Sequence, residues 1–67
     1  MELIVSECNK TKDFVIRTEL HRYKTEEEKE NFAQIWIKAG FTNIYEFIDE
    51  RDNTIIVMYQ RTLSRRF

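Results

Sequence analysis

Residues 25–41 carry a helix start signal, an amphipathic pattern and a helix stop signal, and they constrain the fold more than any other segment. Thr25 is a suitable N-cap, and Glu28 stands three residues later, which is the spacing of a capping box. Gly40 occupies the position where a helix ends in a residue of positive φ, and Phe41 then follows at a position where it can pack back on Trp36. One apolar stripe lies between these signals, formed by Phe32, Ile35, Trp36 and Ala39 and widened on one side by Ala33 and Ile37. The segment predicts one amphipathic helix over residues 26–39.

Strand patterns flank this helix on both sides. We expect strands over residues 2–8, 13–23, 43–49 and 54–63, because each is apolar or alternating and polar turn formers separate the two members of each pair. Strands joined by such short turns pair as antiparallel hairpins. One helix laid on one face of the sheet buries both apolar surfaces. The prediction is a single α+β domain over residues 1–67, with a four-stranded antiparallel sheet made of two hairpins in the order ββαββ.

The alternation of side chains suggests which face of each strand meets the helix. In residues 13–23 we expect the more apolar set to look inward: Phe14, Ile16, Thr18 and Leu20. The other set is expected to meet solvent at least in part: Val15, Arg17, Glu19, His21 and Tyr23. In the last strand we expect Ile55, Val57 and Tyr59 to face the helix, and a register slip of one residue would exchange them with Ile56 and Met58.

Length and composition limit how such a chain can be stabilised. A 67-residue chain is near the lower limit for independent folding, and it has one cysteine and one histidine. An internal disulfide is therefore excluded, and a Cys/His metal site is not expected. Dense aromatic packing or self-association remains, since 13% of the residues are aromatic. The lone cysteine and the lack of a signal-like or membrane-spanning apolar run lead us to expect a cytoplasmic protein.

The net charge of −1 is unevenly distributed. Residues 25–50 carry two basic and seven acidic side chains, whereas residues 51–67 carry four basic and one acidic. We interpret the acidic cluster as favourable charge at the helix start and the basic end as a solvated segment.

Few residues offer chemistry, and each has a simpler structural interpretation. We expect His21 to be a surface histidine, without Glu19 or Cys8 within hydrogen-bonding reach, and Cys8 to be a passive small residue. The glutamates of residues 26–30 diverge around a helix, so capping rather than metal binding explains them. Residues 49–53 read as a hairpin turn rather than a calcium loop. We therefore expect no enzymatic activity and no cofactor.

The apolar surplus points to binding. A helix with one stripe covers one face of the sheet, so the residues of the other face lack a partner within the chain. We expect a non-enzymatic protein–protein interaction module that forms a homodimer through this face or its edge strands, of the kind that serves as a regulator or inhibitor of an unidentified protein in phages, prophages or bacteria. The predicted contact residues are Tyr45, Phe47, Ile56 and Met58, with Arg61 as a rim charge.

Binding of single-stranded nucleic acid is the alternative function. It would use aromatic side chains on the sheet and the basic C-terminal end. The candidate aromatics are Tyr23, Tyr45, Tyr59 and Phe67, and the candidate basic residues include Arg61, Arg65 and Arg66. A pI of about 5.8 argues against a dedicated binder, which usually carries a strongly basic domain.

Overall fold

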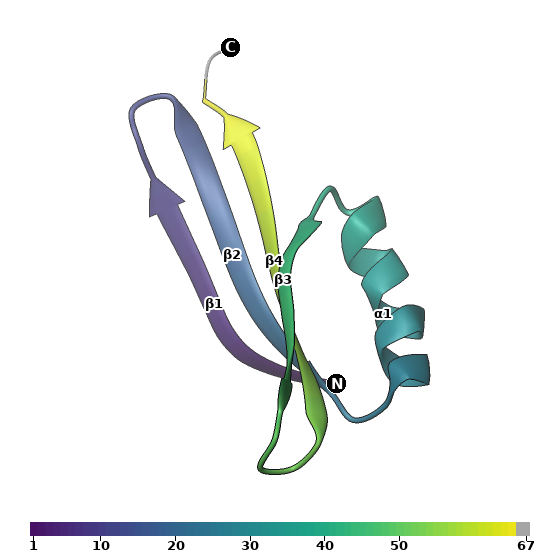
Figure 1. Ribbon diagram of the computed structural model, residues 1–67. Helices are drawn as coiled ribbons and strands as arrows, with labels where there is room; N and C mark the ends of the chain where they lie inside the picture. Colours follow the sequence, from purple (N-terminus) through teal and green to yellow (C-terminus); the bar gives the residue numbers. More distant parts are fainter. Residues whose placement is uncertain (66–67) are drawn as a thin grey trace.

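The computed structural model describes residues 1–65 and consists of two β-hairpins joined through one helix (Figure 1). The strands are β1 (Glu2–Lys10), β2 (Phe14–Tyr23), β3 (Thr42–Asp49) and β4 (Thr54–Ser64), and α1 (Glu26–Lys38) lies between β2 and β3. All neighbouring strands are antiparallel, in the order β1-β2-β4-β3. The predicted ββαββ α+β fold is confirmed. The last strand therefore lies inside the sheet, which accounts for its continuous apolar run.

Local signals at the two ends of α1 act as the sequence predicts, except that the Glu28 carboxylate, which a capping box would direct to the Thr25 amide, pairs with Met1. The Glu28 amide donates to the Thr25 hydroxyl over 3.1 Å, while the Glu28 carboxylate pairs with the amino group of Met1. At the other end Gly40 has a φ of 94°, and its amide donates to the Ile37 carbonyl. The Phe41 amide donates to the Trp36 carbonyl, and the two rings lie 6.0 Å apart. These contacts form a Schellman motif with its hydrophobic contact.

The face of α1 that meets the sheet is narrower than the predicted stripe. Phe32, Ala33 and Trp36 pack on the core, whereas Ile35 is 56% exposed. Ile37 and Ala39 are exposed as well. Placing Ile35, Ile37 and Ala39 in the stripe was therefore wrong, because the helix is rotated so that the i, i+1 and i+4 positions of this turn look inward. Lys29 also holds α1 over β3, since its ammonium lies 3.0 Å from the Glu46 carboxylate.

The core lies between α1 and one face of the central strands β2 and β4. Its buried side chains are Tyr23, Phe41, Ile55, Val57 and Tyr59. The expectation that Ile55, Val57 and Tyr59 face the helix is thus confirmed.

The predicted orientation of β2 was wrong. The helix covers Glu19, His21 and Tyr23, all of which are buried, and not the more apolar face that contains Leu20. The reason is the pairing register with β4. Tyr23 pairs with Ile55, His21 with Val57 and Glu19 with Tyr59, and directly paired residues point to the same side of a sheet. Because the apolar face of β4 packs on α1, the polar face of β2 that is in register with it is buried as well.

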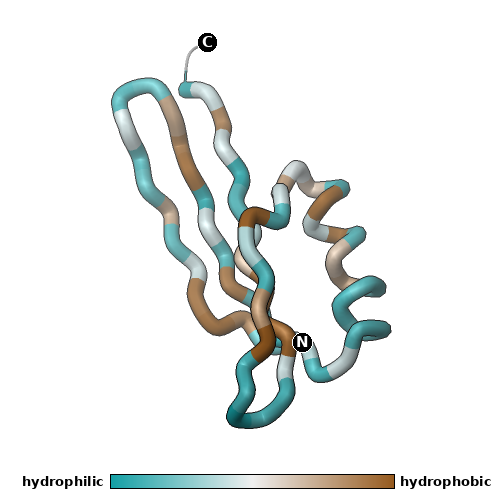
Figure 2. The backbone as a smooth tube through the Cα atoms, in the orientation of Figure 1, coloured by the Kyte–Doolittle hydropathy of each residue, from teal (hydrophilic) through white to brown (hydrophobic). Residues whose placement is uncertain are grey.

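The helix covers only part of the length of the sheet. The molecule measures 43 × 22 × 15 Å, and the β1–β2 hairpin and the end of β4 project beyond the helix (Figure 1). We call this projecting part, residues 7–18 and 60–65, the overhang. Phe14 and Leu63 in the overhang are 45% and 44% exposed. Figure 2 shows hydrophobic segments of β1 and β2 at a distance from α1.

Candidate interaction surface

The side of the sheet away from α1 carries a row of apolar side chains that crosses all four strands. Val5 pairs with Leu20, Leu20 with Met58, and Met58 with Tyr45. Paired residues share one face, so these four side chains lie side by side. Phe47 lies two residues from Tyr45 on the same strand, with a ring separation of 5.6 Å. We call the surface formed by Val5, Leu20, Tyr45, Phe47 and Met58 the open face.

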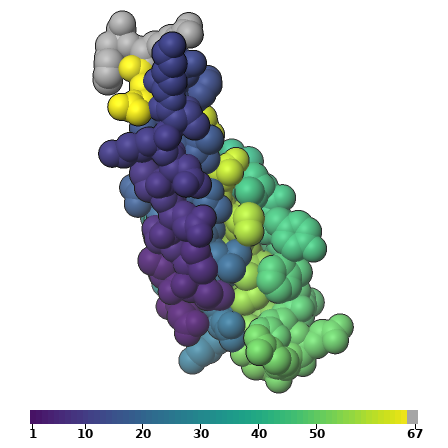
Figure 3. Space-filling view, turned by 90° about the vertical axis from the view of Figure 1, so that its left-hand side faces the viewer, coloured from purple at the N-terminus to yellow at the C-terminus, as the bar shows by residue number. Residues whose placement is uncertain are grey.

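The open face is accessible to a partner. Tyr45 is 59% exposed, Phe47 43% and Val5 39%, and no described helix or strand lies over them. Figure 3 views the sheet from this side and shows the four strands next to one another, from purple β1 through β2 and β4 to green β3. Ile56 is only 1% exposed and forms the floor of the surface between its pairing partners Arg22 and Phe47.

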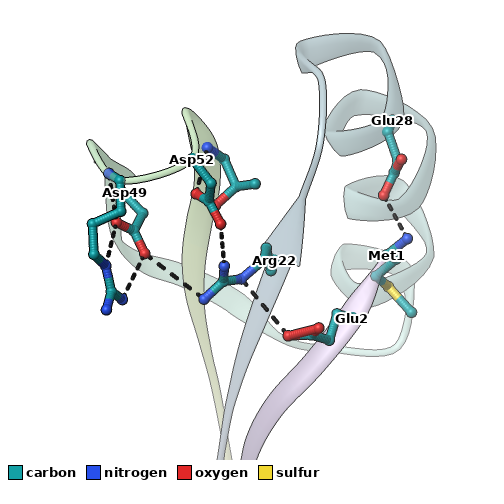
Figure 4. Close-up of polar contacts among 8 residues, drawn as sticks. Met1, Glu2, Arg22, Glu28, Asp49 and Asp52 are labelled. Atoms are coloured by element: carbon teal, nitrogen blue, oxygen red, sulfur yellow. Dashed lines mark hydrogen bonds and ion pairs between the residues drawn. The ribbon is translucent and has the colours of Figure 1, made fainter.

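A polar network borders the open face at the end nearest the β3–β4 turn (Figure 4). The Arg22 guanidinium lies 2.6 Å from Asp52, 3.8 Å from Asp49 and 3.7 Å from Glu2. A hydrogen bond from the Arg51 side chain lowers the pKa of Asp49 to about 2, and Arg22 adds to the effect. Apolar surface thus gives way to paired charges at this border, as at the polar rim of a protein–protein interface.

The structure brings four of the five predicted contact residues together. Tyr45, Phe47, Ile56 and Met58 share the side away from the helix, although Ile56 is buried below the surface. Arg61 lies on the opposite side: it pairs with Arg17, and a β-carbon added at Gly40 would lie 3.5 Å from its Nε. Val5 and Leu20 belong to the same surface, and the sequence interpretation missed them because their place depends on pairing with distant strands.

On the covered side of the sheet, Glu19 and His21 form a buried polar pair. His21 is 1% exposed, and its Nε2 lies 2.9 Å from the Glu19 carboxylate. The interpretation of His21 as a surface residue out of reach of Glu19 was therefore wrong. Residues two apart on one strand share a face, and these two side chains bend toward each other under the rings of Trp36 and Tyr59, at 4.6 and 5.4 Å from the imidazole.

This buried pair is suited to a structural role. Tyr23 and Tyr59 are next to it, with their hydroxyls 3.0 Å apart, and both are fully buried. Burial raises the pKa of Tyr59 and of Tyr23 above the usual range for tyrosine. A substrate has no access to an imidazole sealed under a helix in this way. Cys8 is exposed and pairs with Arg17, whereas His21 pairs with Leu3, five positions away along β1, so the two residues do not form a catalytic pair.

Within residues 1–65 no group of histidine, cysteine and acidic side chains is arranged to hold a metal ion. Residues 50–53 form the β3–β4 turn, in which Asp49 and Asp52 accept hydrogen bonds from the amides of Arg51 and Thr54. The described part of the chain contains no helix long and apolar enough to cross a membrane.

Two features required for nucleic-acid binding lie on opposite sides of the sheet. Tyr23 and Tyr59 are buried and cannot stack on bases, which leaves Tyr45 as the accessible tyrosine of the proposed platform. Arg61 and its neighbour Arg17 lie on the other face. Arg66 and Phe67 lie outside the described residues.

No protein-family model, curated protein or solved structure matches this chain. Its function is therefore inferred from the geometry of its surfaces.

Proposed function

We propose that this protein is a non-enzymatic interaction module that forms a homodimer through the open face. The observation that carries the proposal is the apolar row of Val5, Leu20, Met58 and Tyr45 across four strands, next to the exposed ring of Phe47. Monomeric proteins rarely leave such contiguous apolar surface in water. A second copy of the chain is a suitable partner, because it is present wherever the protein itself is present.

The small core supports self-association. Among the described residues six hydrophobic side chains are buried, while twelve large hydrophobic side chains are exposed. A chain of this length buries too little apolar surface to be more than marginally stable alone, and oligomerisation is one of the usual remedies. Covering the open face would bury additional apolar area without any change in the fold.

Association through faces is favoured over association through edges. The two edge strands are β1 and β3, and each contains an irregularity of register, at Leu3–Val5 and at Asn43–Tyr45. Such bulges interrupt the regular ladder of hydrogen bonds and discourage pairing with another edge. The open face has no such obstacle.

The size of the open face sets the concentration at which the dimer should form. The whole side of the sheet that carries the open face, four strands spaced about 4.8 Å apart over a length of ~30 Å, offers roughly 600 Å² on each copy when all of it is covered. That area is near the lower end for stable protein–protein interfaces, so we expect a dissociation constant in the micromolar range.

The test is sedimentation equilibrium of the full chain over ~10 µM to ~1 mM, with two variants matched in exposure. Tyr45 on the open face is 59% exposed, and Ile37 on α1 is 58% exposed. We expect Tyr45→Glu to weaken the dimer at least ~10-fold, a cost of about 1.4 kcal/mol, because a charge must be buried. Ile37→Glu should leave the dissociation constant unchanged. A wild-type chain that stays monomeric to millimolar concentration, or equal effects of the two variants, would contradict the proposal.

Binding of single-stranded nucleic acid is the competing function. The separation of Tyr45 from Arg17 and Arg61 weighs against it, because stacking and phosphate contacts must act on one strand together. A labelled single-stranded RNA oligonucleotide titrated at low and high salt decides between the two. Binding that weakens steeply with salt and is lost in Tyr45→Glu would favour nucleic acid over a second copy.

The proposal includes a cytoplasmic location and a role as a regulator of an unidentified protein. The lone exposed Cys8 suits a reducing compartment. A dimer formed through the open faces would leave α1 and the overhang free for that further partner.

A further inference from the structure

The overhang carries a group of basic side chains on the side of the sheet where α1 lies. Arg17 on β2 pairs with Arg61 on β4. Arg61 has the same parity along β4 as the core residue Tyr59, so the arginine pair points to the covered side and not to the open face. Lys10 lies on this side as well, where it pairs with Val15. Figure 1 shows that the β1–β2 hairpin and the end of β4 extend beyond α1, so the helix leaves this surface uncovered.

The cations of this surface have few acidic partners within the chain. Among residues 1–65, no carboxylate forms an ion pair with Lys10 or Arg61. Arg17 reaches the carboxylate of Glu19 only at 3.5 Å. The pairing register turns Glu7, the acidic residue of β1 in the overhang, to the other side of the sheet. The positive charge on this side of the overhang is therefore largely uncompensated.

The fold itself does not require the opposed arginines. Like charges that lie directly opposite each other on neighbouring strands destabilise a sheet. Arg17 and Arg61 are such a pair. An anion that contacts both guanidinium groups would remove the repulsion, which is a physical reason to look for a ligand at this place.

Exposed aliphatic side chains lie beside the arginine pair. Val15 pairs with Leu63, which is 44% exposed, and each lies two residues from the arginine of its own strand. Two residues along a strand span about 6.6 Å. A cationic row and an aliphatic row therefore lie at the spacing of alternate residues in an extended chain. We call the surface formed by Lys10, Val15, Arg17, Arg61 and Leu63 the basic surface.

We infer that the basic surface binds an extended acidic segment of the protein that this module regulates. The carboxylates of the segment lie on Arg17 and Arg61, and an aliphatic side chain two positions away lies on the row of Leu63. Guanidinium groups bind carboxylates through charge-assisted hydrogen bonds, which are stronger than hydrogen bonds between neutral groups. This inference rests on the proposed function, because it gives the chemistry of the further partner, but its surface is separate from the open face.

A short protein segment suits the basic surface better than a nucleic acid does. Binding of single strands needs accessible aromatic rings, whereas Tyr23 and Tyr59 on this side of the sheet are buried. Glu26 and Glu27 are exposed at the start of α1, on the same side of the sheet, and they would repel a polyanion long enough to extend along the molecule. A short acidic segment stays within the overhang. Charge complementarity then selects acidic partners over basic ones.

Nuclear magnetic resonance of the isotope-labelled full chain tests the inference. The probe is a short peptide that alternates glutamate pairs with leucine pairs, so that each face of the extended peptide presents an acidic and an aliphatic side chain two positions apart. The control peptide has glutamine in place of every glutamate. We expect the acidic peptide alone to shift the amide signals of the basic surface, and we expect the affinity to fall as salt is added, because salt screens the charges.

Three variants test the role of the arginines. Arg17→Gln and Arg61→Gln should each weaken peptide binding about 3-fold, and together about 10-fold, as is usual for exposed ion pairs. Arg51→Gln is the matched control, because the Arg51 side chain is 86% exposed in the β3–β4 turn. It should leave the dissociation constant unchanged. The signal shifts of the native chain locate the peptide even if a variant fails to fold.

The results that would overturn the inference are distinct from those that bear on the dimer. Equal binding of the two peptides, shifts confined to the open face, no shifts at all, or tighter binding of a single-stranded RNA oligonucleotide at the basic surface would each overturn it. Sedimentation of the chain without peptide is unaffected by any of these outcomes. Tyr45→Glu should bind the acidic peptide as the native chain does, since Tyr45 lies on the open face. A monomeric chain that still binds the peptide at the basic surface would contradict the dimer alone.

Discussion

The two sets of side chains on β2 are buried in the reverse of the order that their polarity suggests. On the covered side, β2 contributes Glu19, His21 and Tyr23, which are buried against α1. On the other side, Leu20 of the same strand belongs to an apolar row that extends to the exposed Tyr45. In β2, therefore, the more polar set of side chains lies inside the molecule and the more apolar set outside, whereas β4 turns apolar residues to the core.

The comparison shows that partners, rather than polarity, decide which face of a strand is buried in a small domain. Glu19 pairs with Nε2 of His21 over 2.9 Å, and the hydroxyls of Tyr23 and Tyr59 form a hydrogen bond of 3.0 Å. A polar group that keeps a hydrogen bond loses little on burial. The apolar face, in contrast, has no such partner among residues 1–65, and we propose that a second copy of the chain covers it.

The largest expected effect is a difference in folding stability between variants on the two faces. Tyr59→Ala removes a fully buried ring beside Trp36 and should destabilise the fold by about 3–5 kcal/mol, enough to unfold a domain of this size. Leu20→Ala on the open face should cost less than half as much in dilute protein, because Leu20 is only partly buried. Urea denaturation followed by circular dichroism measures both. A greater loss for Leu20→Ala would mean that α1 covers the other face.

The second effect tests the buried polar pair. Glu19→Ala leaves Nε2 of His21 buried without a partner, and we expect a loss of about 1–3 kcal/mol in the free energy of unfolding. Glu19→Gln keeps an acceptor at the same position and should cost clearly less. Arg17→Ala is the control, since Arg17 contacts Glu19 only at 3.5 Å and is half exposed. Equal losses for the three variants would mean that the Glu19–His21 hydrogen bond does not stabilise the fold.

The third effect concerns the helix end that fixes α1 on the covered face. Gly40 has a φ of 94°, so Gly40→Ala should destabilise the fold by about 1–2 kcal/mol through backbone strain. The added β-carbon would meet Arg61 at an ordinary contact distance, so crowding adds little. Gly40→Asn is the control, because asparagine tolerates positive φ better than alanine. In thermal unfolding, Gly40→Asn should therefore have a higher Tm than Gly40→Ala. A lower Tm for Gly40→Asn would contradict the explanation by backbone strain.

The smallest effects are expected at the two extremes of pH, and they differ between the faces. Bonding to Arg51 lowers the pKa of Asp49, so its contribution is present above pH ~4 and is lost as the pH falls toward 2. Burial raises the pKa of Tyr59, so its contribution is complete below pH ~10 and is lost as the pH rises further. We expect Arg51→Ala to flatten the acid limb of the stability curve between pH ~4 and 2, because the pKa of Asp49 then returns toward its unfolded value, and to leave the alkaline limb in place. A change in both the acid and the alkaline limb would mean that the Asp49 and Tyr59 sites are coupled.

The helix was predictable from the sequence because its signals are local. Thr25, Gly40 and Phe41 act on backbone groups within one turn of α1, and each makes the contact that its position predicts. The two hairpins were predictable for the same reason, since polar turns join strands that follow one another. Together these local features were enough for the ββαββ order.

The faces of β2 were not predictable, because they depend on a pairing between distant segments. His21 lies opposite Val57, 36 residues later in the chain, and this pairing places it under α1. The alternation within β2 favours the reverse orientation, since Leu20 is more apolar than His21. Four of the predicted contact residues still share one side, because they depend only on the local β3–β4 hairpin, in which Tyr45 pairs with Met58 and Phe47 with Ile56. Arg61 has the opposite parity to Ile56 and Met58 and lies with the core residues.

Methionine oxidation tests the central claim, that a second copy covers the open face, most directly. The sequence contains two methionines: Met58 lies in the apolar row, and Met1 is 47% exposed at the start of the chain. The chain is treated with excess hydrogen peroxide at several protein concentrations, and mass spectrometry of the digested protein gives the oxidation rate of each methionine. We predict that the rate at Met58 falls as the concentration passes through the dissociation constant of the dimer, while the rate at Met1 stays constant. A rate at Met58 that is the same at all concentrations, in parallel with Met1, would contradict the claim.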